Sequence, residues 1–124
     1  YAYQELLQAL GMTALGTDFP VEDIDTRKTF AAAVARKDAN GFPVDGFQPE
    51  NALTPEQALR GMTQWVALAQ FQENDLGTIE VGKWADLTWM DRNWLLVDAQ
   101  SVLATRIFGT CIAGEWCFLE SERQ

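Results

Sequence analysis

The spacing of the apolar residues changes near Asn74, and this change constrains the fold more than any other feature of the sequence. Before Asn74, apolar side chains recur three or four positions apart, which predicts helices over residues 3–10, 26–37 and 54–71. After it, short runs of β-branched and aromatic residues alternate with glycines, which predicts strands over residues 87–90, 106–112 and 115–119. The last two would pair as a hairpin across Ala113 and Gly114. The sequence therefore predicts an α/β portion followed by a β portion.

A short apolar run at residues 12–15 follows the first helix, which Gly11 is expected to end. A run of this kind predicts a strand covered on both faces, as in a parallel sheet. Asp18 stands at the carboxyl end of that strand, where parallel α/β folds place their working residues. Its carboxylate can ligate a metal or take a proton from metal-bound water. Alternatively, Asp18 only satisfies backbone N–H groups of the turn.

Local signals mark the starts of the later helices. Asp25 or Thr26 can cap the second one, and Thr54-Pro55-Glu56-Gln57 combines a hydroxyl cap, an early proline and a glutamine three positions after the cap. Glycines and prolines interrupt residues 40–51, which predicts a loop of about a dozen residues. A loop of that length suggests a functional role or a crossing between structural units; alternatively, a long loop is simply tolerated at this position.

Composition excludes several kinds of site. The chain has no histidine, so it lacks the commonest general base and the commonest transition-metal ligand. Cys111 and Cys117 are its only cysteines. They could face each other across a turn, but we expect two buried free thiols. No self-contained zinc site and no Ser-His-Asp or Cys-His pair can be assembled from these residues.

Charge and hydropathy limit the partners. The chain carries 9 Lys and Arg against 18 Asp and Glu, a formal charge of −9, which disfavours nucleic acid and anionic lipid. No apolar run approaches the roughly 18 residues of a membrane span. We therefore expect a soluble protein without a membrane partner, favour the cytoplasm, and leave the compartment open.

The segment from Leu76 to Asp91 has a sequence pattern typical of a structural role rather than a catalytic one. Ile79 and Val81 alternate as a short strand, and glycine at 82 with lysine at 83 predicts a tight reversal. Asp86 begins the next strand, where it can hydrogen-bond the backbone of the turn, so we assign it a structural role.

Two of these segments resemble a known family. Residues 77–87, G-x-I-x-x-G-K-x-A-D-L, resemble the C-terminal signature of the metal-dependent amidohydrolase superfamily, and "LGTDFPVE" at 15–22 resembles its eighth-strand Asp motif as seen in amidohydrolase family 3. The capped helix between them and the closing hairpin are similar in order to the same family. The resemblance covers essentially the whole chain.

The resemblance implies the last βα portion of a TIM-type (β/α)8 barrel in residues 1–73 and strands of a small composite β-sandwich in residues 74–124. It implies hydrolysis of carbon–nitrogen or related bonds with one or two divalent metals, zinc foremost. Asp18 would be both a catalytic residue and a metal ligand, shuttling a proton from water to the leaving group. No residue here matches the family's other catalytic positions.

A closed barrel needs about 250 residues, so 124 residues cannot form one. We therefore expect a C-terminal fragment that is inactive and metal-free on its own, acts on a small molecule only within the longer enzyme, and associates with its remaining N-terminal part or with itself as a homo-oligomer. Five tryptophans in so short a chain favour such association, although the alternative is that some of them share ordinary cores. The alternative is a non-catalytic α+β module for assembly or ligand binding.

Overall fold

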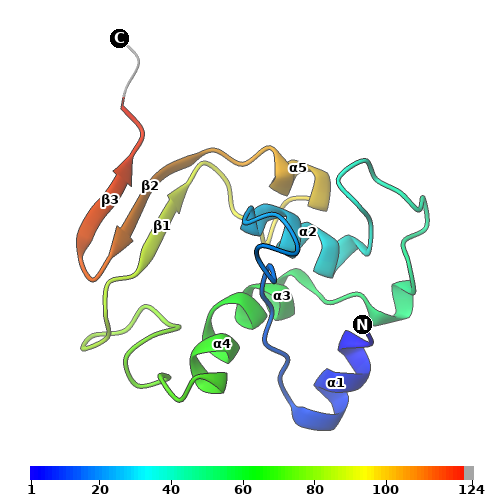
Figure 1. The fold of residues 1–124 in the computed structure, drawn as a ribbon, viewed down its shortest axis with the longest axis horizontal. Coiled ribbons are helices and arrows are strands. Elements are labelled where there is room, and N and C mark those ends of the chain that lie inside the picture. Colours follow the sequence, from blue (N-terminus) through cyan, green and yellow to red (C-terminus); the bar gives the residue numbers. More distant parts are fainter. Residues whose placement is uncertain (122–124) are drawn as a thin grey trace.

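The computed structural model describes residues 1–121. Its helices gather on one side and a three-stranded sheet extends from them on the other (Figure 1). The order of elements is α1 (Tyr3–Leu10), α2 (Thr26–Ala35), the 3₁₀ turn η1 (Pro49–Asn51), α3 (Pro55–Met62), α4 (Gln64–Ala69), β1 (Leu87–Met90), α5 (Ala99–Leu103), β2 (Ile107–Ile112) and β3 (Glu115–Leu119). None of the helices in this described part has the length and apolar character that crossing a bilayer requires.

The first two helices form where the sequence predicts them. α1 ends at Gly11, which adopts a left-handed conformation and donates its N–H to the Leu7 carbonyl at 2.8 Å. Asp25 caps α2 by accepting the Arg27 N–H. α2 ends at Ala35, two residues earlier than expected, because Arg36 takes a left-handed conformation with φ 56°. The irregular stretch at 40–51 is confirmed as a loop that closes with η1.

Residues 12–15 do not form the expected strand within this chain. A strand requires a neighbouring strand to pair with, and none of the three described strands lies beside this segment. Thr13 and Leu15 are buried while Ala14 is exposed, so one side of the segment is covered rather than two. The prediction of coverage on both faces is therefore wrong for the chain by itself.

The single helix expected over 54–71 is broken in two. Its start is confirmed: Thr54 accepts the Gln57 N–H at 3.2 Å, and the Gln57 side chain accepts the Thr54 N–H at 2.9 Å. The break falls at Thr63, whose φ of −129° and ψ of −85° leave the helical region. The Thr63 hydroxyl donates to the Leu59 carbonyl at 2.8 Å, a local bond that competes with regular helix geometry.

The sheet is antiparallel, in the order β1-β2-β3, and its strands match the predicted ones to within one residue. The β2–β3 hairpin is confirmed, with Ile112 opposite Glu115. The short strand expected at 79–81 is wrong. Ile79 and Val81 lie in a loop at 89% and 108% exposure, and no strand pairs with them.

The hydrophobic core lies among the helices and draws on both halves of the sequence. It contains Leu15, Phe30, Ala33, Leu53, Ala58, Trp94 and Val102. The rings of Phe30 and Trp94 are in contact, with centroids 4.9 Å apart. The sheet contributes less, because all five residues of β3 are exposed. The division at residue 73 therefore stays a prediction, since this core crosses it.

The two cysteines and the tryptophans differ in burial. Both thiols are free, as expected, but Cys117 is exposed and only Cys111 is buried, so the expectation of two buried thiols is wrong for Cys117. The reason is the position of Cys117 on the exposed edge strand β3. Trp94 lies in the core, whereas Trp84, Trp89 and Trp116 are more than half exposed.

Candidate active site

Asp18 lies on the segment that leads from the extended residues 12–15 into α2. Its backbone is left-handed, with φ 56°, a conformation that aspartate tolerates better than most residues. The Asp18 carbonyl accepts the Val21 N–H at 2.8 Å and closes a turn. The Phe19 N–H bonds to the Thr17 hydroxyl at 3.2 Å, so the turn uses threonine rather than the Asp18 carboxylate for its local bond. The side chain of Asp18 is exposed to solvent.

A cavity of about 580 Å³ opens beside this turn. Asp18 lines it together with Leu15, Glu22, Asp23, Lys28 and the alanines at 31–33 of α2. Asp18 therefore faces a hollow in the surface rather than open solvent on all sides. It does not cap α2, since Asp25 does.

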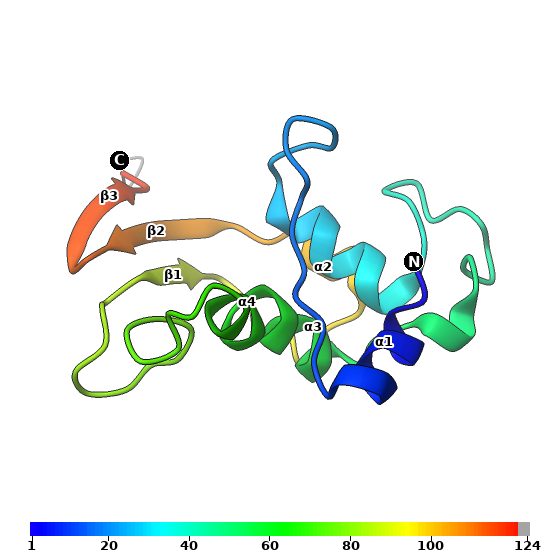
Figure 2. The same ribbon diagram turned by 60° about the horizontal axis from the view of Figure 1, so that its bottom comes forward.

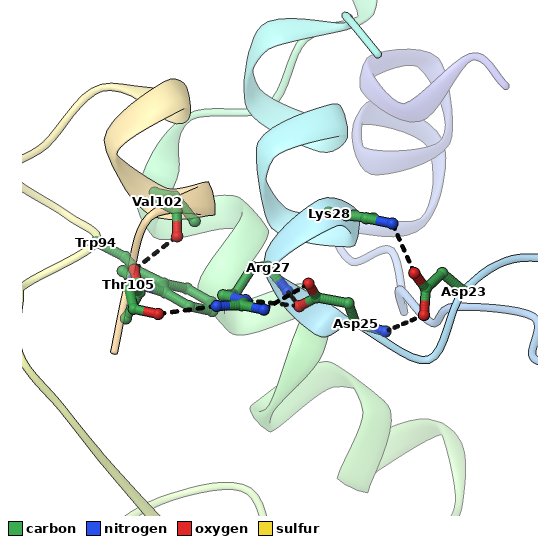
Figure 3. Close-up of polar contacts among 7 residues, drawn as sticks. All are labelled: Asp23, Asp25, Arg27, Lys28, Trp94, Val102 and Thr105. Atoms are coloured by element: carbon green, nitrogen blue, oxygen red, sulfur yellow. Dashed lines mark hydrogen bonds and ion pairs between the residues drawn. The ribbon is translucent and has the colours of Figure 1, made fainter. Parts of the chain in front are cut away.

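Cations hold two of the three other acidic residues of the segment, Asp23 and Asp25. The Lys28 ammonium donates to Asp23 at 2.6 Å, and this hydrogen bond lowers the pKa of the Asp23 carboxyl. The Arg27 guanidinium donates to both oxygens of Asp25 at 2.8 Å and likewise lowers the pKa of that carboxyl. Asp23 and Asp25 are thus occupied by structural contacts (Figure 3), which leaves Asp18 and the neighbouring Glu22, both on the cavity, as the carboxylates of this segment suited to a ligand.

The described residues do not supply the ligands of a complete metal site. Across residues 1–121, no group of three or more His, Cys, Asp or Glu side chains converges in a way that could hold one. The chain has no histidine, and the Asp23 carboxylate on the same cavity is paired with Lys28. These residues therefore do not make a metal centre by themselves. Asp18 fits the role of a single carboxylate ligand at most.

Sequence reasoning found Asp18 but missed the residues around it. Lys28 lines the same cavity, and Arg27 ties the cap of α2 to the carbonyl of Thr105 at 2.9 Å. The charges at Asp23, Asp25, Arg27 and Lys28 are visible in the sequence, but only a cap from Asp25 or Thr26, and no ion pair, was predicted there. Nothing in the sequence indicates the hydrogen bond from Arg27 to the Thr105 carbonyl, because the two positions are 78 residues apart.

Comparison with known proteins gives the family. A family model described as "Amidohydrolase family" matches residues 1–118. The chain is 32% identical over 113 residues to Protein LONG AFTER FAR-RED 3 of Arabidopsis thaliana, covering 88% of this chain and 19% of that protein. It is 31% identical over 93 residues to N-substituted formamide deformylase of Arthrobacter pascens, covering 75% of this chain and 17% of that protein.

The chain thus spans less than a fifth of the length of either relative. No solved structure gives a significant match. The family model, however, covers both the Asp18 turn and the segment at 76–91, the two places where the sequence resembles amidohydrolases. On this evidence the chain belongs to the amidohydrolase family.

Proposed function

We propose that this chain is the C-terminal part of a metal-dependent hydrolase that cleaves carbon–nitrogen, non-peptide or related bonds of a small molecule. The observation that carries the proposal is the family match over residues 1–118. Members of this family generally depend on a metal. The name of the Arthrobacter relative specifies N-substituted formamides, which contain a carbon–nitrogen bond of the proposed kind.

Within that enzyme, Asp18 is proposed as a catalytic residue and as one ligand of a divalent metal, zinc in the first instance. Three observations support this role: Asp18 is exposed, it lines the cavity of about 580 Å³, and its carboxylate neither caps α2 nor accepts the Phe19 N–H of its own turn. A carboxylate so placed can also accept a proton from water. The remaining ligands would come from outside these 124 residues, since the chain has no histidine.

The proposed architecture follows the same reasoning. Residues 1–73 would be the last βα portion of a (β/α)8 barrel, and residues 74–124 would supply strands to a small β-sandwich. The extended, one-sided segment at 12–15 supports the first part, because its exposed side is free to be covered. The exposed edge strand β3 supports the second. The partner is then the N-terminal remainder of the enzyme or, failing that, a second copy of the chain.

The exposed face of β3 also favours a second candidate, a non-catalytic module for assembly or ligand binding. Trp116, Phe118 and Leu119 are each about half exposed on this strand, at 51%, 47% and 54%. Apolar side chains gathered on an edge strand are typical of an interaction surface. A module of this kind would need no metal.

Metal analysis and hydrolysis assays separate the two candidates. The chain would be purified alone and also fused behind the N-terminal four fifths of a family relative, then loaded with zinc and tested on N-substituted formamides and other amides. For the hydrolase, we expect metal and turnover in the fusion and neither in the chain alone.

The variant Asp18→Asn tests the site within that fusion. We expect a loss of turnover of roughly 10²–10⁴-fold, the range for removing a proton-transferring group. Asp45→Asn is the matched control, because Asp45 is an exposed aspartate in the 40–51 loop, away from the cavity. Equal turnover and metal content in the two variants would contradict the role of Asp18, and a fusion without metal or turnover would favour the non-catalytic module.

A further inference from the structure

The turn that carries Asp18 is fixed mainly at its two ends. At the first end, Leu15 is buried in the core and donates its N–H to the Gly61 carbonyl at 2.9 Å. Between the ends, Phe19, Val21 and Ile24 are all exposed and add nothing to the core. Figure 2 shows this blue segment rising away from α2 before it enters the helix. The place of Asp18 therefore depends on how firmly both ends are held.

The second end is held by one carboxylate and one guanidinium. Asp25 Oδ1 accepts the backbone N–H of Arg27 at 3.1 Å and its Nε at 2.8 Å, while Oδ2 accepts Nη2 at 2.8 Å. Asp25 is thus both the cap of α2 and half of a bidentate ion pair. The pair is partly shielded, with side-chain exposures of 36% for Arg27 and 24% for Asp25.

A further donor of the same guanidinium reaches the other half of the sequence. Arg27 Nη1 donates to the Thr105 carbonyl at 2.9 Å (Figure 3). Thr105 is 2% exposed, and its hydroxyl donates to the Val102 carbonyl at 2.6 Å and accepts the Trp94 indole N–H at 2.8 Å. The guanidinium is therefore attached to a buried group that is itself held on two sides, just before β2 begins.

We propose that Arg27 is a positioning residue, which holds the Asp18 turn in place relative to the sheet-bearing half by joining Asp25 to the Thr105 carbonyl. The planar fork of arginine can serve both acceptors at once, whereas a lysine ammonium on a single flexible stem cannot reproduce the bidentate geometry. The neighbouring pair of Lys28 and Asp23 is more exposed, and among the described residues it makes no hydrogen bond to Thr105 or Trp94. The consequence for hydrolysis rests on the proposed function of Asp18, but the positional claim does not.

Solvent-exchange NMR on the whole chain tests the positional claim. The Val21 amide reports on the turn, because its N–H bonds to the Asp18 carbonyl. The Arg106 amide directly follows the Thr105 carbonyl and senses its hydrogen bond, and the Ala58 amide in the buried part of α3 reports on global opening. In Arg27→Met we expect the Arg106 resonance to shift and Val21 to exchange roughly tenfold faster, with Ala58 changed less than about twofold.

Two other variants sharpen the test. Lys28→Met removes the adjacent positive charge and should leave the Arg106 resonance in place and Val21 exchange within about twofold of the native rate. Arg27→Lys keeps the charge but not the planar fork. Its Val21 exchange rate and its Arg106 shift should lie between those of the native chain and those of Arg27→Met. If Arg27→Met does not fold, Arg27→Lys decides by the same three amides.

The proposal is overturned if Val21 exchange in the Arg27 variants stays at the native rate, or if Val21 and Ala58 accelerate by the same factor, which would mark a purely global loss of stability. It is also overturned if Lys28→Met reproduces the Arg27→Met pattern. Because these readouts are amide resonances, an absence of hydrolytic activity would count against the proposed function and leave this result unaffected.

Discussion

Leu15 and Gly61 are in such close contact that a side chain at position 61 has no room. The Leu15 N–H donates to the Gly61 carbonyl at 2.9 Å, and a Cβ built on Gly61 would lie 2.8 Å from Leu15 Cγ and 2.9 Å from the Thr13 carbonyl oxygen. This close approach seats the extended segment 12–15 on α3. It also sets the start of the turn that carries Asp18.

Gly61→Ala should therefore destabilise the protein although it lies in a helix. Alanine would favour α3 by about 1 kcal/mol through helix propensity. The clash with the Thr13 backbone cannot be relieved by a rotamer change, and overpacking of this kind costs about 1–3 kcal/mol. We expect a net loss of about 1 kcal/mol in the free energy of unfolding, measured by urea denaturation.

The matched control is Gly16→Ala, one residue beyond Leu15. A Cβ there would meet no atom within 4 Å, so we expect a change within about 0.5 kcal/mol. Equal unfolding midpoints for the two variants would contradict the close packing of Leu15 on Gly61.

Lys83 should stabilise the exposed loop that precedes β1. Its ammonium, on a side chain only 15% exposed, contacts the Glu73 carbonyl at 2.6 Å, the Thr78 hydroxyl at 2.6 Å and the Glu80 carboxylate at 2.9 Å. Lys83→Met removes all three contacts while keeping a chain of similar length. We expect a loss of about 1–3 kcal/mol in unfolding free energy and easier proteolysis of residues 73–84.

Lys28→Met is the control for that experiment, since Lys28 makes one exposed ion pair with Asp23. Its thermal midpoint should stay near the native value. A Lys83→Met chain that resists protease like the native one would show that the loop does not depend on this lysine.

Acid should destabilise the fold, and Asp91 should account for part of the effect. Hydrogen bonds from Arg92 are the main cause that lowers the Asp91 pKa to about 2, and the Arg106 N–H adds to it. A native pKa below the unfolded value of about 3.9 means that the unfolded chain binds the proton more readily. The contribution is therefore present above about pH 4 and lost as pH falls towards 2.

Unfolding free energy measured from pH 8 to pH 2 checks this. We expect a nearly flat curve between about pH 5.5 and 8, since the chain has no histidine, and a decline below about pH 4. Asp91→Asn should lower stability at neutral pH and flatten the acid decline, whereas Asp45→Asn should leave both unchanged. An unaltered decline in Asp91→Asn would contradict the role of this carboxylate.

The elements that local chemistry specifies were predictable from the sequence. The cap at Gly11, the capping box at Thr54 and the three strands depend on neighbouring residues, and the structure confirms them. Asp86 is structural, as expected, but its carboxylate accepts the N–H of Ala113 at 2.7 Å in the β2–β3 turn rather than binding the turn just before it. The kind of role was visible in the sequence, while the partner was not.

The failures arise where distant contacts decide the conformation. Helical periodicity does not disclose the break at Thr63, and alternation at Ile79 and Val81 cannot form a strand without a neighbour to pair with. For the site, the pattern around Asp18 predicted a carboxylate in a turn beside a strand end, and its catalytic role stays a prediction. The tie from Arg27 to Thr105 could not be foreseen, because it bridges 78 positions.

Thr105→Val should show how much the buried hydroxyl of Thr105 contributes to the stability of the fold. Valine has nearly the same shape but removes the acceptor of the Trp94 indole N–H and the donor to the Val102 carbonyl. The Trp94 indole N–H would lose its partner, whereas the Val102 carbonyl keeps the Thr105 backbone N–H at 3.0 Å. We therefore expect a loss of about 1–3 kcal/mol in unfolding free energy, measured by urea denaturation. The hydrogen bond to Arg27 uses the Thr105 backbone carbonyl and is retained.

Thr105→Ser is the control, because it keeps the hydroxyl and loses one methyl group. Its cost in unfolding free energy should be smaller, about 0.8 kcal/mol. If the serine variant were the less stable of the two, packing of the methyl group rather than the hydrogen bonds would be what Thr105 supplies.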